Sequence, residues 1–276
     1  MSLKDLFGRY WQQHYHALAS LQHPLLVGVS GGIDSVVLVH LLKANAIPFA
    51  IAHVNFKLRD TESDRDEAFV RELAQMLDVA IYVQQFDTHT YAMTHKLSIQ
   101  EAARKLRYDW FADISGISYI ATAHHANDNI ETAFMYFLRG TGIDGLTGIP
   151  AKHKERKLVR PLLPFTRKEI DQYAVENTIT YVEDSSNKKN EYTRNLFRNI
   201  VLPEIEKVFP QAEKNIQANI QRFGEISDLY KEAVAVRLKK LITAKGEEIH
   251  IPVLKWQSQK QLATITWELI KHYGFT

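Results

Sequence analysis

The sequence contains no cysteine among its 276 residues. This absence excludes disulfides, thiolate metal sites and any mechanism that needs a cysteine nucleophile or a persulfide carrier. Long apolar runs are also missing, because no run approaches the roughly 20 residues that a membrane helix needs. The first 13 residues are polar and aromatic and do not resemble a signal peptide. We therefore expect a cytoplasmic protein that is not held in a membrane.

An excess of charge of one sign is missing too. The 34 lysines and arginines nearly balance the 32 aspartates and glutamates, and the net charge is only +2. A nucleic-acid partner is not indicated by this value alone, since such proteins usually have a strongly basic domain or face. Hydrophobic residues make up 45% of the chain, which is enough for one large or two medium domains with real cores.

Apolar runs typical of β-strands recur at 25–29, 47–54, 79–86 and 118–123. Helical patterns fill the gaps between them. Strands separated by segments of helix length predict an α/β fold, a doubly wound parallel sheet with helices on both faces. Ligands bind such sheets beyond the carboxyl ends of the strands, so the residues that follow these strands are expected to border one crevice.

The second part of the chain has a different pattern. Residues 150–165 are basic and contain prolines, which predicts an exposed loop or hairpin, and helical patterns follow at 166–176 and 192–207. Phe209 and Pro210 indicate a boundary before a long helix that reaches Leu241. We expect one domain over residues 1–209 and a helical C-terminal region over residues 210–276.

A turn with two adjacent glycines joins the first predicted strand to the next helix. Its residues are Ser30, Gly31, Gly32, Ile33, Asp34 and Ser35. Adjacent glycines let the backbone approach an anion closely, and the start of the helix presents unpaired N–H groups. The turn has neither the ending of a Walker A loop nor the spacing of a dinucleotide fingerprint. It predicts a site for the phosphates of a nucleotide, and an ordinary strand-to-helix turn is the alternative.

Asp34 begins the helix that follows the glycines. A carboxylate repels a bare phosphate there, but the two groups are compatible if Mg²⁺ lies between them, because magnesium is usually bound by one or two carboxylates and by phosphate oxygens. The alternative is an acidic residue that only benefits from the helix dipole.

A second group of polar residues follows the strand at 118–123. Asp128 and Glu131 stand three residues apart, a spacing that suits a cationic amine substrate near the phosphates and equally suits a capping box at the start of a helix. His124 precedes them and could stabilise phosphate charge or move a proton, or it could be a structural histidine.

Arginines form two pairs with helical spacing. Arg104 and Arg107 are three residues apart, and Arg194 and Arg198 are four apart. Such pairs are usually solvated, but beside a nucleotide crevice they would bind the phosphates of ATP or of a nucleic acid. Arg139 and Gly142 lie in a second glycine-rich turn, which is either a helix C-cap or a further phosphate contact.

Taken together, these motifs resemble the tRNA(Ile)-lysidine synthetases, a family of pyrophosphate-loop ATPases with the adenine nucleotide alpha-hydrolase fold. The resemblance extends in order over residues 30–35, 53–59, 101–108, 124–131, 139–146, 160–163 and 183–203. The loop motif alone is shared with GMP and NAD synthetases and with tRNA thiolases. Four residues favour the lysidine family: Asn187, Arg194, Asn195 and Arg198.

The resemblance implies a ligase that uses ATP and Mg²⁺. It adenylates the C2 oxygen of the wobble cytidine in tRNA(Ile) with a CAU anticodon, and L-lysine then displaces AMP to give lysidine. In this reading, ATP binds to residues 30–35 with His53, Arg139 and Gly142, and Mg²⁺ binds to Asp34. Catalysis falls to Asp34, His124, Arg104, Arg107, Arg194 and Arg198, and lysine binds to Asp128 and Glu131.

The chain departs from the family pattern in two ways. Phe56 stands where the family usually has a second histidine, and many members continue into C-terminal domains of which residues 210–276 are expected to be only the first, cut short. A small-molecule amidating ligase, similar to NAD or GMP synthetase, is the second hypothesis, and a non-catalytic nucleotide-binding module is the third. The sequence is compatible with a homodimer and leaves the oligomeric state open.

Overall fold

The computed structural model describes residues 1–20, 22–183, 193–246 and 248–273. Asn187 and the rest of the segment 184–192 lie outside the described residues. The chain divides into two compact units, one of residues 1–132 and 149–214 and the other of residues 133–148 and 215–276. The expected domain boundary after residue 209 stays a prediction. Among the residues that the structure describes, no helix is both long enough and apolar enough to span a bilayer.

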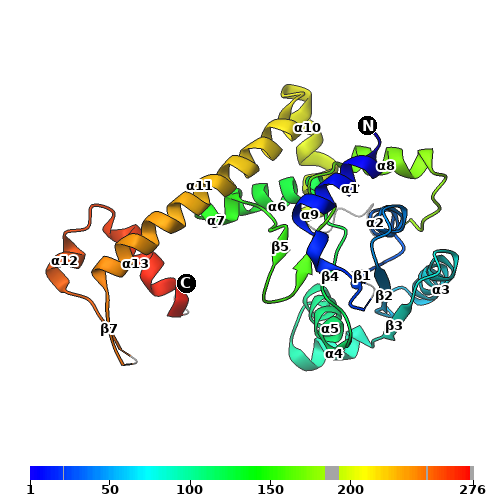
Figure 1. Ribbon diagram of the computed structural model, residues 1–276, viewed down its shortest axis with the longest axis horizontal. Helices are drawn as coiled ribbons and strands as arrows, with labels where there is room; N and C mark the ends of the chain where they lie inside the picture. The colour runs from blue at the N-terminus through cyan, green and yellow to red at the C-terminus, as the bar shows by residue number, and fades with distance from the viewer. Residues whose placement is uncertain (21, 184–192, 247, 274–276) are drawn as a thin grey trace. The chain divides into compact units, whose positions relative to one another are not determined.

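The first unit is built on a six-stranded sheet with the order β3-β2-β1-β4-β6-β5 (Figure 1). The strands are β1 (Leu25–Gly28), β2 (Phe49–Asn55), β3 (Ile81–Gln85), β4 (Ile120–Ala121), β5 (Lys152–His153) and β6 (Leu158–Val159). All neighbours are parallel except β5 and β6. The chain enters at the central strand β1, extends to β2 and β3 on one side and returns to β4 on the other. The predicted doubly wound sheet is therefore confirmed.

Helices cover both faces of this sheet, as the alternation of side chains along β1 shows. Leu25 and Val27 belong to a core with α1 (Leu3–His14), α2 (Ile33–Ala44), α3 (Asp60–Met76) and α8 (Arg167–Glu176). Leu26 points to the opposite face and packs in a second cluster with Phe111 of α5 (Ile99–Asp113). Successive strand residues point to opposite faces, so a continuous apolar run is what a sheet covered on both sides requires.

The predicted hairpin at 150–165 exists, but half of it is not exposed. Leu158 and Val159 of β6 pair in parallel with β4 and are 2% and 0% exposed. Arg160 follows them and is also buried. The expectation of an exposed segment is wrong for these residues, because β6 extends the main sheet. The turn at residues 154–157 is exposed as expected.

Several shorter helices complete the first unit. α4 (Thr88–His95) precedes α5, and α6 (Ala126–Leu138) begins in this unit after β4. The helix predicted over 192–207 is divided into α9 (Thr193–Leu196), a π-helical turn (Phe197–Val201) and α10 (Leu202–Val208). Arg198 lies in this π-helical turn, a type of interruption that occurs frequently at functional sites.

The second unit contains the long helix α11 (Ala212–Leu241), which the sequence predicted to end at Leu241. The short helix α7 (Ile143–Leu146) is attached to it, since Asp144 accepts hydrogen bonds from Ser227 and Lys231 of α11. A hairpin of β7 (Thr243–Lys245) and β8 (Glu248–His250) follows, and then α12 (Val253–Gln257) and α13 (Leu262–Ile270). β8 ends at His250, and Val253 already begins α12.

Candidate active site

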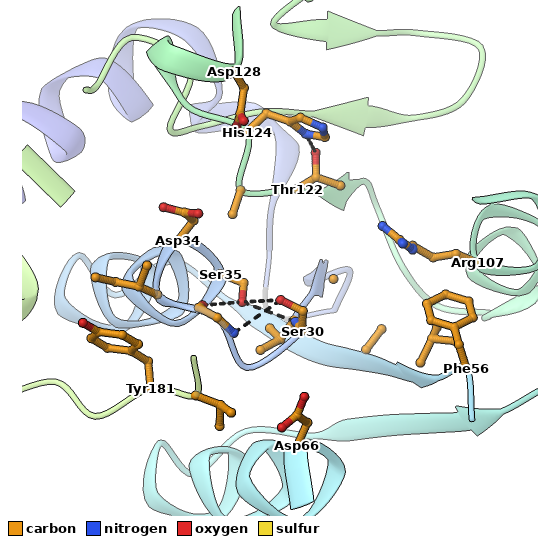
Figure 2. A pocket seen from close by; sticks show the side chains of 18 of the residues that line it. Ser30, Asp34, Ser35, Phe56, Asp66, Arg107, Thr122, His124, Asp128 and Tyr181 are labelled. Carbon is orange, nitrogen blue, oxygen red and sulfur yellow. Dashed lines mark hydrogen bonds between the residues drawn. The ribbon is translucent and has the colours of Figure 1, made fainter. Parts of the chain in front are cut away.

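A pocket of about 660 Å³ opens at the carboxyl ends of β1, β2 and β4 in the first unit (Figure 2). This edge is where the chain reverses direction in the sheet, the usual place for a ligand in a doubly wound fold. Ten residues predicted from the sequence line the pocket: Ser30, Gly32, Ile33, Asp34, Ser35, Arg107, His124, Asp128, Arg194 and Arg198.

The glycine-bearing turn forms one wall of the pocket. Gly31 has a φ of +95°, a conformation that side chains with a Cβ rarely adopt. The hydroxyl of Ser35 accepts from the backbone N–H of Ser30 at 3.3 Å and donates to the carbonyl of Gly32 at 2.9 Å. Gly32 is the N-cap of α2, and no side chain caps the helix there. The first N–H groups of α2 are therefore available to an anion.

Asp34 extends from the first turn of α2 into the pocket (Figure 2). Its Oδ1 is buried without a hydrogen-bond partner among the described residues, and its Oδ2 lies 3.5 Å from Nη1 of Arg167. Burial raises the pKa of this carboxyl group, against the opposing charges of His125 and Arg167. A buried carboxylate oxygen without a hydrogen-bond partner is suited to bind a cation that enters the pocket together with a ligand.

Magnesium is compatible with Asp34 but would need further ligands. Within the described part of the chain, no group of three or more histidine, aspartate or glutamate side chains is placed to bind a metal. Mg²⁺ is commonly bound by one or two carboxylates together with phosphate oxygens and water. Asp34 therefore fits as the protein ligand of a magnesium ion that the phosphates of a nucleotide would complete.

Two carboxylates and two arginines form a charge cluster at the other wall. The fully buried Glu131 accepts from Nε of Arg194 at 2.8 Å and from Nε of Arg198 at 2.6 Å. Asp128 accepts from Nη2 of the same arginines at 3.2 and 2.8 Å. Each charge in this cluster thus has an opposite partner, in the geometry that makes arginine and carboxylate pairs strong.

The two carboxylates of the charge cluster differ in access to the pocket. Asp128 lines the pocket, whereas Glu131 is 0% exposed and is not among the lining residues. Burial acts to raise the pKa of Asp128, but His125 and Arg194 hold this pKa below its usual range. Binding of lysine by these carboxylates stays a prediction.

The alternative prediction of a capping box over residues 128–131 is wrong. α6 begins at Ala126, and Asp128 accepts a hydrogen bond from the backbone N–H of His125 at 3.0 Å. Glu131 contacts the two arginines and does not reach back to the start of the helix. Glu131 is paired instead with arginines of α9 and of the π-helical turn, and whether Asp128 also binds lysine stays a prediction.

The adjacent histidines occupy different environments. Nδ1 of His124 lies 2.9 Å from the hydroxyl of Thr122, and burial lowers the pKa of His124 to about 4. His125 is 2% exposed, and its Nε2 lies 3.5 Å from Asp128 and 3.8 Å from Asp34. His125 was not among the site residues predicted from the sequence, although its position next to His124 could have indicated that it lies at the pocket. It lies between the two carboxylates of the pocket.

Phe56 and Arg107 form a third part of the pocket (Figure 2). The guanidinium of Arg107 lies 5.4 Å from the centre of the Phe56 ring, within cation–π range. Arg104, one turn away on α5, is exposed and stacks over Tyr108 at 5.1 Å. At Phe56, where the resemblance implies a histidine in other members, the aromatic ring contacts the guanidinium of Arg107.

The remaining predicted ligands of ATP are placed differently. His53 is 3% exposed and donates from Nδ1 to the carbonyl of Val29 at 2.8 Å, and it is not among the lining residues. Gly31 is buried behind the turn. Arg139 and Gly142 belong to the second unit, so their contribution to ATP binding stays a prediction.

Three pocket residues had no sequence signal that we recognised. Arg167 reaches Asp34 from the first turn of α8, and its backbone N–H donates to Asn127 at the start of α6. Asp66 is buried and accepts from Arg59 at 3.1 Å, and Tyr181 also lines the pocket. These residues come from helices and loops whose approach to the pocket depends on tertiary packing.

Known proteins share these features. The PP-loop domain family model matches residues 7–205. A curated tRNA(Ile)-lysidine synthase from Chlorobaculum tepidum is 35% identical, and the match covers 95% of this chain and 82% of that protein. The chain belongs to the tRNA(Ile)-lysidine synthase family. As a PP-loop protein it belongs to the ATP-using families, and the family resemblance found in the sequence is confirmed.

Other members of the tRNA(Ile)-lysidine synthase family are longer. The relative from Parabacteroides distasonis is 39% identical over 95% of this chain and 59% of its own length. The relative from Porphyromonas gingivalis is 37% identical over 91% of this chain and 55% of its own length. The chain thus spans little more than half the length of these two lysidine synthases.

Solved structures support the fold that is expected for a tRNA(Ile)-lysidine synthase. A U34-tRNA thiolase from Methanococcus maripaludis, solved with its [4Fe-4S] cluster, matches 80% of this chain and 78% of its own with a TM-score of 0.63 at 17% identity. NMN synthetase from Francisella tularensis matches 81% of this chain and 92% of its own with a TM-score of 0.50 at 14% identity. These likenesses confirm the fold alone.

Proposed function

We propose that this chain ligates L-lysine to C2 of the wobble cytidine of tRNA(Ile) with a CAU anticodon, consuming ATP and releasing AMP and pyrophosphate. The observation that carries the proposal is one pocket that combines the uncapped start of α2 at the glycine-bearing turn with the carboxylates of Asp34 and Asp128, in a chain related to tRNA(Ile)-lysidine synthases. The proposed tRNA substrate places the reaction in the cytoplasm.

In the first step, the C2 oxygen of the cytidine attacks the α-phosphorus of ATP. A P–O bond forms to the base, and the bond to pyrophosphate breaks. The N–H groups of the 30–35 turn and of the start of α2 bind the phosphates. Asp34 would bind Mg²⁺, which supplies charge neutralisation for the phosphates. Arg107 and the neutral His124 face the same pocket and stabilise the charge that develops.

In the second step, the amine of lysine attacks C2 of the adenylated base. A C–N bond forms, the C–O bond to the adenylate breaks, and the amine loses a proton as AMP leaves. Adenylation is needed because a ring carbonyl oxygen is a poor leaving group, whereas AMP leaves as a stable anion.

Asp128 is the residue that we assign to the cationic end of lysine. It lines the pocket, and its carboxylate would be shared between the ammonium group of lysine and the two guanidinium groups that already donate to it. Glu131 is buried behind it and holds Arg194 and Arg198 in position. We therefore assign Glu131 a positioning role, with the two arginines directed toward the reacting base.

The experiment that tests the proposal measures AMP formation from Mg²⁺-ATP, lysine and an unmodified tRNA(Ile) transcript with a CAU anticodon. Mass analysis of the digested nucleosides then identifies the product. We expect a cytidine heavier by one lysine minus water, and only when both lysine and tRNA are present. AMP formed without tRNA would instead support a small-molecule ligase, and nucleotide binding without any turnover would support a non-catalytic module.

A further inference from the structure

Arg167 lines the pocket beside Asp34, and the reaction described above gives it no part. It is the first residue of α8, a helix that packs against α2. Two hydrogen bonds fix the backbone at this point. The side chain of Thr166 caps the helix by accepting from the N–H of Glu169, and the N–H of Arg167 donates to Asn127 at 2.8 Å. The guanidinium is therefore carried on a rigid support beside the pocket.

The guanidinium of Arg167 has donors to spare. Its Nε donates to Asp171 at 2.7 Å, and its Nη1 lies 3.5 Å from Oδ2 of Asp34. Nη2 donates to no group in the part of the chain that the structure describes. The contact with Asp34 is long, since charge-assisted hydrogen bonds measure about 2.7 to 2.9 Å. Arg198, by comparison, donates to Glu131 at 2.6 Å. Arg167 can therefore bind a further anion without losing a strong contact.

Arg107 and Arg167 approach the glycine-bearing turn from opposite faces of the sheet. α8 packs in the core with α1, α2 and α3, whereas α5, which carries Arg107, packs on the other face. Figure 2 shows Arg107 on one side of Ser30 and Asp34 on the other. A phosphate chain that starts at the α5 side and crosses the turn would end beside Asp34 and Arg167. Apolar lining that suits a nucleoside lies on the α5 side: Gly28, Ala52, Val54, Phe56 and Phe111.

We propose that Arg167 is a catalytic residue that binds the β- and γ-phosphates of ATP and stabilises the pyrophosphate as it leaves. This inference rests on the proposed function. In its first step, the bond from the α-phosphorus to the bridging oxygen breaks, and that oxygen keeps the electron pair. Negative charge therefore grows on the leaving group, and a guanidinium fixed beside it lowers the barrier. The planar fork of arginine suits this role, because it donates to two phosphate oxygens at once.

The test compares Arg167→Gln with a control variant, Lys168→Gln. Lys168 is the next residue of α8, is exposed and does not line the pocket, so the control removes the same charge from the same helical turn. Isothermal titration calorimetry measures the affinity of each protein for ATP, for pyrophosphate and for AMP at saturating Mg²⁺. AMP lacks the two phosphates that Arg167 is assigned to bind, so it reports on the rest of the nucleotide site.

We expect Arg167→Gln to bind ATP and pyrophosphate at least about tenfold more weakly than the parent chain, the effect of losing one charge-assisted hydrogen bond. Its affinity for AMP should stay within about twofold, and the control variant should stay within about twofold for all three ligands. AMP formation in a single turnover should fall by about a hundredfold in Arg167→Gln, more than the loss of binding alone, because the contact strengthens as the leaving group gains charge.

An affinity for pyrophosphate that is unchanged or higher in Arg167→Gln overturns the proposal, because this result is expected if Arg167 only neutralises Asp34 and competes with Mg²⁺ there. An equal loss of affinity for AMP overturns it as well. If Arg167→Gln lowers the melting temperature, Arg167→Lys replaces it. That variant keeps the charge but loses the fork, and it should bind pyrophosphate about threefold or more weakly.

The proposed function fails separately, because it requires that the parent chain form lysidine. A parent chain that binds pyrophosphate through Arg167 but forms no lysidine would refute the function and leave Arg167 as a phosphate-binding residue.

Discussion

Two walls of the pocket differ in whether their charged and polar groups have partners within the protein. In the charge cluster, Asp128 and Glu131 already hold both arginines, and Glu131 is fully buried. At the phosphate-binding turn, α2 begins without a side-chain cap and Asp34 keeps a buried oxygen without a hydrogen-bond partner. The charged groups of the charge cluster are all paired with one another. At the turn, the N–H groups at the start of α2 and one oxygen of Asp34 have no such partner among the described residues.

This difference indicates how each wall contributes to function. A buried polar group without a partner raises the energy of the folded chain, so it persists where a ligand completes it. A saturated group of buried charges fixes the orientation of its side chains. We therefore expect the turn to govern binding and activation of ATP, and the charge cluster to govern stability and the position of the arginines.

The largest effect is expected from Asp34→Asn, which removes the carboxylate from the wall at the turn. AMP formation in a single turnover should fall by about a hundredfold or more, since charge stabilisation of this kind typically contributes that much. Stability in urea at pH 7 should not fall. Burial raises the pKa of Asp34, which means that the folded state disfavours the charged carboxylate. A neutral amide at this position avoids the cost of burying that charge. A variant that loses stability together with activity would contradict our view of this wall.

Glu131→Gln tests the charge cluster. It removes the charge that holds two arginines, and we expect a loss of about 3 kcal/mol in the free energy of unfolding, the lower end for a broken buried ion pair because both arginines are partly exposed. Urea unfolding measures the loss. The matched control is Asp109→Asn, which breaks the exposed pair with Lys105 and should leave the unfolding midpoint unchanged. Equal midpoints in the two variants would show that the charge cluster does not stabilise the fold.

His124 lines the pocket, and its buried imidazole makes the stability of the fold depend on pH. Burial lowers the pKa of His124 from 6.5 to about 4, so the unfolded chain binds more protons than the folded chain between these values. Stability should therefore fall as the pH drops from about 6.5 toward 4, with a contribution of at most about 1.4 kcal/mol per pH unit from this residue. His124→Gln should remove that contribution. Identical pH profiles of unfolding in the two proteins would exclude a buried neutral histidine.

The smallest effect concerns Phe56 beneath Arg107. Phe56→Leu keeps an apolar side chain but removes the ring, and we expect a two- to tenfold increase in the KM for ATP from the lost cation–π contact. Phe56→His should retain most of the contact at pH 8 and lose it below about pH 6, where an imidazolium would repel the guanidinium. Initial rates at both pH values measure this. If the leucine and histidine variants respond equally to pH, the ring does not position Arg107.

Much of the fold was predictable because its signals are local. The apolar runs predicted four strands, and the glycine pair placed the phosphate-binding turn at the end of the first one. Their alternation with helices predicted a parallel sheet covered on both faces. The sixth strand was missed, because β6 is only two residues long and becomes a strand by pairing with β4. A segment so short has no periodicity of its own.

The candidate site was predictable in its residue types but not in its contacts. Asp128 and Glu131 were selected by spacing, yet a capping box and a ligand site have the same spacing. His53 was selected by its position after a strand and lies buried against Val29 instead. Arg167 had no signal, since only the packing of α8 against α2 brings it to Asp34.

The sequence by itself determined the class of fold, the family and the glycine-bearing turn that follows β1, because these depend on neighbouring residues and on their order along the chain. Only the tertiary structure decided which charges meet. Arg194 and Arg198 are 63 and 67 residues from Glu131 along the chain, and their hydrogen bonds form because α9 and the π-helical turn pack against α6. Whether side chains so far apart along the chain come into contact depends on how their helices pack, and no local sequence pattern predicts it.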